Sequence, residues 1–341
     1  MRRAVLLILL IGILLTGCAK TPPQPERVSY TATYLTLFDT LTTIKGFAES
    51  DAAFQLIAQQ IHDSLEEYHQ LFDIYHTYED INNLKTINDA AGKTAVKVDQ
   101  KIISLLLDCQ KYYDLTGHRV NAAMGSVLSL WHDARIHGIN DPLSAALPDT
   151  NALLMAAEHM DLGCVVINEA DSTVFITDPD VSLDVGAVAK GWATQQVAKN
   201  APAGLLISVG GNVCATGPKD ESGTPWVVGI QDPDSSEYLH TIYVTKGSVV
   251  TSGDYQRAYT VDGKSYHHII DPDTLYPSAY WRSVTIVCED SGLADALSTA
   301  LFLLPQAEGQ AILDHCGAMA LWVSMDGTIL YSPGFENLIR T

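Results

Sequence analysis

Asp295, Ser298 and Thr299 have the residue types and the spacing of a magnesium site. Positions i, i+3 and i+4 of an α-helix share one face, so a helix over residues 291–304 would direct one carboxylate and two hydroxyls to one point. Hard oxygen ligands of this kind suit Mg²⁺, especially when a substrate phosphate supplies further oxygens. The alternative is ordinary helix packing, in which Ser and Thr hydroxyls bond back to the preceding turn.

A second candidate lies in residues 183–191, where an acid, two small residues and a lysine lead into a predicted helix. Asp184 precedes Gly186 and Ala187, and Lys190 falls in the first helical turn. Free N–H groups and the helix dipole attract anions at such a terminus, so a lysine there favours a phosphate or an acidic partner. An exposed lysine at an ordinary turn would give the same pattern.

A third candidate combines the loop at residues 252–254, Ser-Gly-Asp, with a strand that carries His267 and His268 and ends in Asp271-Pro272. A histidine near an aspartate can act as a general base at neutral pH. Because successive residues of a strand point to opposite faces, we expect one histidine at most in the site and the other in a structural role.

Gly210 and Gly211 form a fourth candidate, between an apolar strand and Asn212. Paired glycines allow positive φ or a close approach of the backbone to a ligand. A tight turn between two strands explains the pair equally well.

The apolar pattern places these residues on a framework that mixes helices and strands. Residues 52–75 repeat apolar side chains at three- and four-residue spacing, which predicts an amphipathic helix. Asp99 is a plausible N-cap for a helix that reaches about residue 113. Further helices are expected at 150–160, 187–199, 291–304 and 306–314. Strands are expected at 30–46, as one or two, and at 164–168, 173–177, 205–209, 226–231, 241–245, 248–251, 265–270, 282–288, 319–324 and 328–331.

This order of elements favours an α+β fold. Strands and helices are interspersed without regular βαβ alternation, which argues against a doubly wound parallel sheet. The glycine fingerprints of dinucleotide-binding folds and P-loops are absent from the sequence.

Composition excludes two broad classes of protein. Apolar residues make up 47% of the 341 residues, which is enough for a sizeable core and excludes disorder throughout. The net charge of −20 lacks the basic footprint of sequence-independent nucleic-acid binding, so no nucleic-acid partner is expected. A phosphate-bearing ligand would need a metal ion or helix N-termini to offset the repulsion.

The N-terminus has the pattern of a membrane-anchored lipoprotein. Arg2-Arg3 precedes an apolar run at residues 4–15, and Leu15-Thr16-Gly17-Cys18 resembles a bacterial lipobox. We therefore expect a signal peptide at 1–17, a proline-containing tether at 18–29 lipidated on Cys18, and one folded unit at 30–341, held at the extracytoplasmic side of a membrane. An ordinary signal peptide with a chance cysteine is the alternative. The remaining five cysteines are expected to be thiols rather than a disulfide framework.

Together, and in this order, the candidate segments resemble the ApbE family of FAD:protein FMN transferases, or flavin transferases. The resemblance spans about residues 30–335. It rests on Phe38-Asp39-Thr40, residues 121–125 with Leu130-Trp131, residues 183–191, Gly210-Gly211, Trp226, and residues 252–255, 268–272 and 294–299. It implies a single T-fold-related α+β catalytic unit with mixed, mostly antiparallel sheets and flanking helices.

The resemblance also implies an activity. Members bind FAD and Mg²⁺, transfer the FMN half to a Thr or Ser hydroxyl of a target protein, and release AMP. Their targets are typically extracytoplasmic redox proteins, such as subunits of Rnf- and Nqr-type complexes, which a lipid-anchored enzyme would reach. Two alternatives remain: a Mg²⁺-dependent FAD pyrophosphatase, and a non-catalytic flavin-binding lipoprotein.

Site residues follow from the resemblance position by position. It implies metal ligation by Asp295, Thr299 and the carbonyl of Ala187, with Ser298 as a further candidate, and it makes His268 the group that deprotonates the acceptor. The implied FAD contacts are Phe38, Tyr75 or the competing Tyr78, Arg119, Val120, Asn121, Asp184, Lys190 and Ile269.

The chain departs from the family pattern at several positions. Many members have Gly-Ala-Phe-Asp where this chain has His118-Arg119-Val120-Asn121, so FAD contacts there must use different side chains. Asp39 and Leu275 stand where glycine is common, and Asn212 replaces a frequent aspartate.

Overall fold

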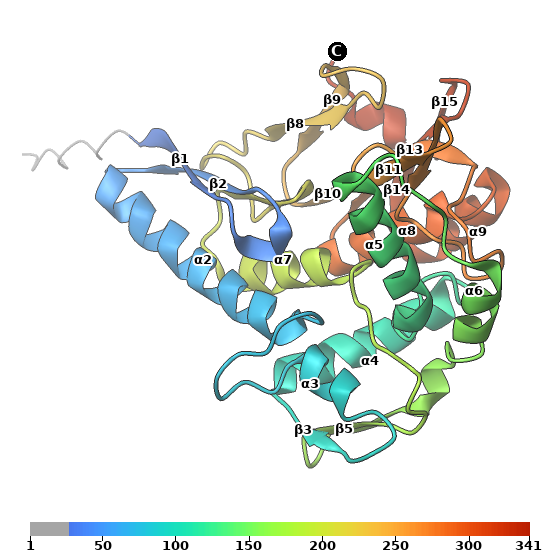
Figure 1. Cartoon of the computed structure of the whole chain (residues 1–341). Helices are drawn as coiled ribbons and strands as arrows, with labels where there is room; N and C mark the ends of the chain where they lie inside the picture. Colours follow the sequence, from blue (N-terminus) through green and yellow to red (C-terminus); the bar gives the residue numbers. More distant parts are fainter. Residues whose placement is uncertain (1–26) are drawn as a thin grey trace, which may run out of the picture.

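An eight-stranded antiparallel sheet is the centre of the computed structural model, which describes residues 27–341 (Figure 1). Neighbouring strands pair antiparallel throughout this sheet. Across the sheet the order is β1 (Val28–Tyr34), β2 (Thr42–Ala48), β6 (Leu205–Val209), β7 (Asn212–Ala215), β10 (Gly247–Gly253), β13 (Trp281–Cys288), β14 (Met319–Ser324) and β15 (Ile329–Tyr331).

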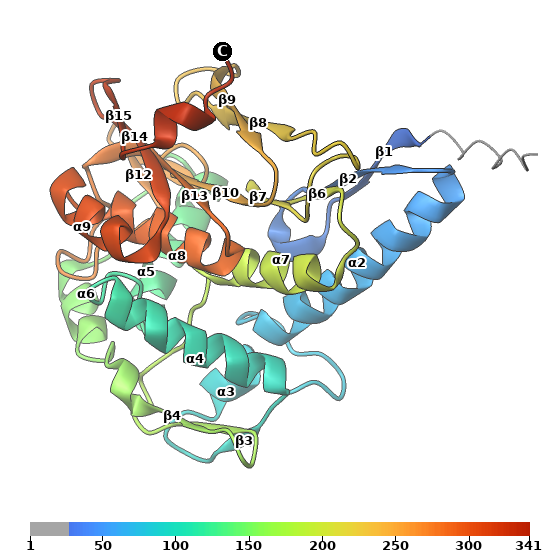
Figure 2. The same cartoon turned by 180° about the vertical axis from the view of Figure 1, so that it is seen from behind.

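Helices cover one face of the sheet and a hairpin covers part of the other. The helical layer contains α2 (Asp51–Phe72), α7 (Ala189–Asn200) and α8 (Ser291–Phe302), with α9 (Gln306–Cys316) beside β14 (Figures 1 and 2). The hairpin of β8 (Trp226–Gln231) and β9 (Tyr238–Val244) packs on the opposite face, where Trp226, Leu321 and Phe335 belong to one buried apolar cluster. The sheet is therefore buried between two layers over much of its width.

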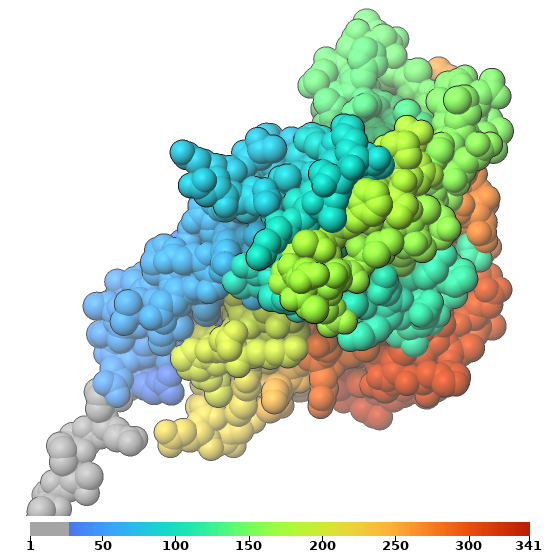
Figure 3. Space-filling model, turned by 90° about the horizontal axis from the view of Figure 1, so that it is seen from below, coloured from blue at the N-terminus to red at the C-terminus, as the bar shows by residue number. Residues whose placement is uncertain are grey.

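Two smaller units flank the helical layer. The first contains α3 (Leu84–Asp89), α4 (Gln100–Leu115) and a small sheet of β3 (Val96–Lys97), β5 (Thr173–Ile176) and β4 (Val165–Asn168), which lie side by side in Figure 3. The second contains α5 (Gly125–Asn140), α6 (Thr150–Ala157) and the hairpin of β11 (Ala258–Val261) and β12 (Lys264–His267), packed around Trp131 and Tyr259.

The sequence prediction of an α+β fold is confirmed, and local signals explain the best-predicted helices. The side chain of Ser50 caps α2 by accepting from Ala53 N–H at 3.2 Å, and the apolar stripe of that helix is buried. Asp99 caps α4 as predicted, by accepting from Lys101 N–H at 2.7 Å. Residues 30–46 belong to two strands rather than one.

Some elements differ from the expectations. Helix α5 was not predicted, because its apolar residues are spread around the helix: Val127 and Trp131 are buried on one face, whereas Ile136 and Ile139 are exposed on the other side. Helix α3 is too short to show a periodic pattern. The strand expected at 265–270 ends at His267, and β11 was not predicted.

Residues 1–26, with the predicted signal peptide, Cys18 and most of the tether, lie outside the described residues. From residue 27 onward, no helix combines the length and the apolar character needed to cross a membrane. The five described cysteines, which are Cys109, Cys164, Cys214, Cys288 and Cys316, are free thiols.

Candidate active site

A cavity of about 1000 Å³ lies where the ends of the central sheet, the start of α7 and the β11–β12 hairpin meet. Its walls bring together residues that are more than 250 positions apart in the chain. All but two of the predicted site residues line it: Phe38, Tyr75, Arg119, Val120, Asn121, Asp184, Ala187, Lys190, His268, Ile269, Asp295 and Thr299. The exceptions are Ser298, which is not among the lining residues, and Cys18, which lies outside the described part of the chain.

Asp295 of α8 faces the first turn of α7. Its Oδ2 atom accepts a hydrogen bond from Gly191 N–H at 2.8 Å and lies 3.8 Å from Lys190 Nζ. Val188, which precedes α7, supplies no side-chain cap. Asp295 therefore caps α7 from a neighbouring helix and places a negative charge at its positive end.

Gly191 makes this contact between the helices possible. A Cβ atom at this position would lie 2.2 Å from the carbonyl oxygen of Ser291 and 2.4 Å from Cβ of Asp295. Neither atom is the end of a flexible side chain, so α7 and α8 approach closely only because residue 191 is glycine.

Gly191→Ala is expected to lower the free energy of unfolding by about 1–3 kcal/mol, because α7 and α8 must separate to admit the methyl group. The displacement also moves Lys190 relative to Asp295, so activity should fall with stability. Urea unfolding followed by circular dichroism measures the first effect.

Gly327→Ala is the matched control for this prediction. Gly327 lies in the β14–β15 turn with φ +85° and with no atom near its missing Cβ, so backbone strain should cost about 1–2 kcal/mol while activity is retained. Wild-type stability and wild-type activity in Gly191→Ala would contradict the packing argument.

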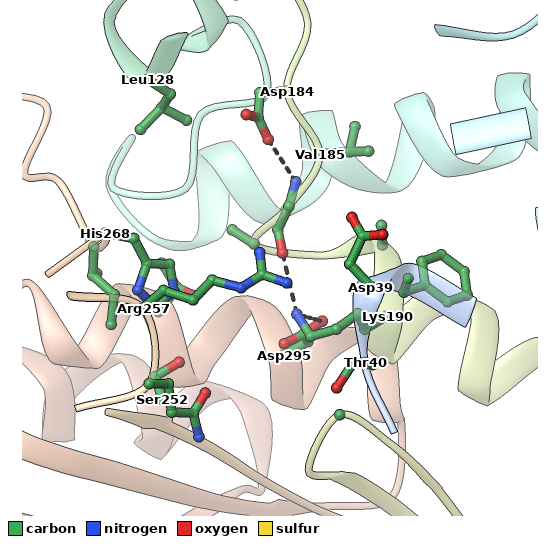
Figure 4. Close-up of a pocket in the computed structure, with 18 of the residues that line it drawn as sticks. Asp39, Thr40, Leu128, Asp184, Val185, Lys190, Ser252, Arg257, His268 and Asp295 are labelled. Carbon is green, nitrogen blue, oxygen red and sulfur yellow. Dashed lines mark hydrogen bonds and ion pairs between the residues drawn. The ribbon is translucent and has the colours of Figure 1, made fainter. Parts of the chain in front are cut away.

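The loop before α7 is connected to Asp295 through Gly186 and Lys190 (Figure 4). Asp184 Oδ1 accepts from Gly186 N–H at 2.8 Å, and Lys190 Nζ donates to Gly186 O at 3.3 Å. Among the described residues, the only ion pair of Lys190 within 4.0 Å is with Asp295. The lysine thus neutralises Asp295 and holds the loop rather than pairing with Asp184.

The three oxygen-bearing side chains predicted from α8 do not point in one direction. Asp295 and Thr299, at i and i+4, line the cavity, and the hydroxyl of Thr299 makes no hydrogen bond to another described residue. Ser298 is fully buried instead; its hydroxyl donates to Asp295 O at 2.8 Å and lies 2.8 Å from Ser252 Oγ. The Ser298 hydroxyl thus bonds back to the preceding helical turn, which was the alternative to metal binding in the sequence analysis. Asp295 and Thr299, in contrast, line the cavity together with Ala187.

These residues fit a magnesium ion that is shared with a substrate phosphate. Burial raises the pKa of Asp295, while the Lys190 charge and the Gly191 N–H oppose that rise. Burial also raises the pKa of Asp184, so a bound cation would favour the ionised form of both carboxyl groups. The neighbouring Asn212 lies close enough to lower the pKa of Asp295, yet its buried Nδ2 atom has no hydrogen-bond partner among the residues described. One carboxylate, one hydroxyl and a carbonyl leave coordination positions for phosphate oxygens.

The described residues contain two tighter groups of potential metal ligands, and both lie outside the cavity. They are His62-Asp63-Glu66 and His159-Asp178-Asp180. Among the described residues, the cavity contains no cluster of three such ligands.

His267 and His268 have different environments, although β12 ends at His267 and His268 lies in the bend that follows it. The ring of His267 is buried, with Nε2 2.8 Å from Ser278 O and Nδ1 accepting from Ile269 N–H at 3.2 Å. Both ring nitrogens are therefore used in packing the hairpin. His268 faces the solvent of the cavity, where enclosure by protein atoms and the charges of Arg257 and Lys190 lower its pKa to about 3. It is consequently a neutral imidazole at physiological pH.

Aromatic side chains also line the cavity. The Tyr75 ring stacks on His132 at 5.0 Å, with its hydroxyl 3.3 Å from His132 Nδ1, and the tyrosine remains 52% exposed. Tyr78 also lines the cavity, but its hydroxyl donates to Asp73 at 2.8 Å. Tyr75 therefore offers the more accessible ring for a planar ligand.

Ion pairs and hydrogen bonds to neighbouring loops hold residues 118–121, the segment that differs from the family pattern. Arg119 pairs with Asp271 at 3.1 Å and with Asp273 at 2.5 Å, which ties it to the turn after β12. The Asn121 amide donates to Met160 O and accepts from Ala123 N–H. These contacts leave Arg119 and Asn121 on the cavity wall with much of their polar capacity already used.

Two departures from family glycines coincide with left-handed backbone. Asp39 has φ 52° and Leu275 has φ 63°, in the region that favours glycine. Aspartate tolerates this region better than leucine, and Leu275 gains burial and a hydrogen bond from Trp131 Nε1 to its carbonyl at 2.9 Å. The chain therefore adopts left-handed backbone at both places without glycine, at some cost in strain.

Sequence reasoning missed Arg135 and Arg257, both of which line the cavity. Arg135 lies on α5, so its spacing from Trp131 and His132 had no meaning without that helix. Arg257 follows the Ser-Gly-Asp-Tyr segment by two residues, and that proximity was the available signal.

Comparison with known proteins identifies the family. A family profile described as the ApbE family matches residues 38–322, most of the chain. The chain belongs to the ApbE family. A protein of Treponema pallidum (strain Nichols) named FAD:protein FMN transferase is 31% identical over 325 residues, which cover 88% of this chain and 86% of that protein. One of the same name from Klebsiella pneumoniae (strain 342) is 31% identical over 72% of this chain and 77% of its own length.

Solved ApbE structures share the fold. The crystal structure of the ApbE protein of Thermotoga maritima superposes with a TM-score of 0.79 at 28% identity and covers 93% of this chain and 100% of that chain. The flavin transferase ApbE of Vibrio cholerae gives a TM-score of 0.74 at 20% identity over 92% of this chain and 100% of that chain. The single α+β unit expected from the resemblance is therefore the ApbE architecture.

Proposed function

We propose that this ApbE protein transfers FMN from FAD to a Thr or Ser hydroxyl of a target protein in a Mg²⁺-dependent reaction and releases AMP. The observation that carries the proposal is one cavity with an oxygen-rich end at Asp295, Thr299 and Ala187 and a neutral imidazole at His268. The names of the relatives agree with this reaction.

FAD would occupy the cavity through contacts with Phe38, Tyr75, the 119–121 segment, Asp184, Lys190 and Ile269. Asp295, Thr299 and the Ala187 carbonyl would hold Mg²⁺ beside the pyrophosphate, and bound Mg²⁺ would neutralise phosphate charge there. This arrangement would offset the repulsion between an anionic substrate and a chain of net charge −20.

His268 would accept the proton of the acceptor hydroxyl. The hydroxyl oxygen forms a bond to the FMN phosphorus while the bond from that phosphorus to the bridging oxygen breaks, and AMP leaves with the bonding electrons. The imidazolium then returns its proton to solvent. Lys190 would remain beside Asp295 and keep the loop at 184–190 in place.

We further propose that the protein acts at the extracytoplasmic side of a membrane, anchored by a lipid on Cys18. The support is the lipobox-like sequence that ends at Cys18. Extracytoplasmic redox proteins, including subunits of Rnf- and Nqr-type complexes, would then be the targets within reach.

A transfer assay separates this function from its alternatives. The protein is incubated with FAD and Mg²⁺, with and without a Thr-bearing acceptor, and AMP and in-gel flavin fluorescence are measured. Acceptor-bound flavin with stoichiometric AMP supports transfer. AMP formed equally without acceptor would indicate a pyrophosphatase, and FAD binding without AMP would indicate a non-catalytic flavin-binding protein.

A further inference from the structure

Two arginines in the cavity have no acidic partner in the part of the chain that the structure describes. Arg119 and Arg282 each pair with two aspartates, whereas Arg135 and Arg257 make no ion pair within 4.0 Å among the described residues. The Nη2 atom of Arg135 lies 3.4 Å from His132 Nδ1. In a chain with 40 acidic residues, two cations left unpaired in one cavity leave their donors available to an external anion.

Their proximity has an energetic cost in the absence of a ligand. Burial and the neighbouring charge of Arg257 both lower the pKa of Arg135. Two like charges placed together in a partly enclosed site repel each other, and a bound anion removes that repulsion. The pair therefore favours ligands with clustered negative oxygens, such as phosphates.

Arg257 occupies the position between the two functional ends of the cavity. Its side chain points from the side of His268 toward the loop at 184–190 (Figure 4). Its charge acts on both neighbours, because it lowers the pKa of His268 and also lowers that of Asp184 against the rise caused by burial. A phosphoryl group held beside Asp295 and attacked by an oxygen next to His268 would therefore lie near the Arg257 guanidinium.

We propose that Arg257 is a catalytic residue that binds the non-bridging oxygens of the FMN phosphoryl group during its transfer. This inference rests on the proposed function. As the acceptor oxygen bonds to phosphorus and the bond to AMP breaks, charge spreads over those oxygens, and the planar guanidinium can donate two parallel hydrogen bonds to them. The contact strengthens in the transition state, so it should raise the rate more than the affinity for FAD.

The test compares Arg257→Gln, Arg257→Lys and Arg135→Gln with the wild type. We expect Arg257→Gln to lower kcat about 10²–10³-fold while the Kd for FAD, from quenching of flavin fluorescence, changes less than about tenfold. Arg257→Lys should recover part of the rate, since it keeps the charge and loses the fork. Arg135→Gln should lower kcat less than about tenfold.

A separate control tests whether the Arg257 variants fold normally. Arg257 is exposed and makes no ion pair with another residue from position 27 onward, so the thermal midpoint of Arg257→Gln should equal or exceed that of the wild type. Arg340→Gln removes an arginine that does not line the cavity and should leave kcat unchanged.

Several outcomes would overturn the proposal. They are a kcat of Arg257→Gln within threefold of the wild type, a rise in KM with unchanged kcat, or equal losses in Arg257→Gln and Arg135→Gln. AMP release without acceptor is measured in parallel. If the wild type hydrolyses FAD but transfers no flavin, the proposed function fails, and the same kcat comparison on hydrolysis still decides the role of Arg257.

Discussion

Asp295→Ala is expected to abolish FMN transfer, with a loss of at least about 10³-fold in kcat. The substitution removes the carboxylate that would hold Mg²⁺, the ion-pair partner of Lys190 at 3.8 Å and the acceptor for Gly191 N–H at 2.8 Å. In-gel flavin fluorescence of an acceptor protein measures the loss.

Asp295→Asn separates the role of the charge from the role in folding. Asparagine retains an oxygen that can accept from Gly191 N–H, so the cap on α7 is kept. Because burial raises the pKa of Asp295, ionising this carboxyl costs stability at neutral pH in the absence of metal. We therefore expect the metal-free Asn variant to be at least as stable as the wild type at pH 7 and still inactive.

Calorimetric titration with Mg²⁺ in the presence of FAD gives a second measurement, independent of turnover. Affinity for Mg²⁺ should fall in both variants. Wild-type transfer by Asp295→Asn would remove Asp295 from the metal site.

His268→Ala is expected to slow transfer about 10²–10⁴-fold while the Kd for FAD changes less than about tenfold. The imidazole faces the cavity and its nitrogens make no hydrogen bond to another described residue, so it is free to accept a proton. Single-turnover transfer at saturating FAD measures the rate. His315→Ala, on the exposed end of α9, is the matched control and should behave as the wild type. An equal loss of rate and of FAD affinity would assign His268 to substrate binding.

The lowered pKa of His268 predicts an unusual pH profile for the free enzyme. A pKa of about 3 lies below the ordinary value of 6.5, so the neutral, proton-accepting form persists as the pH falls toward about 4. The profile of kcat/KM should therefore lack an acid limb near pH 6.5, and the imidazole signals of His268 should not titrate there in NMR spectra. A limb near pH 6.5 that disappears in His268→Ala would contradict this environment.

Local signals in the sequence were strong enough to predict the best-defined helices. The stripe of α2, the Asp99 cap of α4 and the apolar run of α8 depend on neighbours within a few residues, and those interactions are visible in the chain itself. Helix α5 lacked such a signal because packing against α6 and β11 stabilises it. Arg135, which it carries into the cavity, was missed for the same reason.

In the candidate site, too, local spacing predicted some features and tertiary contacts decided the others. Spacing on one helix predicted that Asp295 and Thr299 would share a face, and alternation along a strand predicted different environments for His267 and His268. Spacing could not show that the Ser298 hydroxyl would bond to Asp295 O and Ser252, because that choice depends on a strand 46 residues away.

Residue types and order, by themselves, determined the family, the fold class and most of the candidate residues. Tertiary structure alone decided how their charges are shared: Lys190 lies beside Asp295, Asp295 caps α7 across the close contact at Gly191, and Arg257 has no acidic partner within residues 27–341. The physical reason is the distance along the chain over which each kind of interaction acts. Secondary structure follows from interactions over three or four residues, whereas electrostatic and packing interactions depend on distances in space that join residues far apart in the chain.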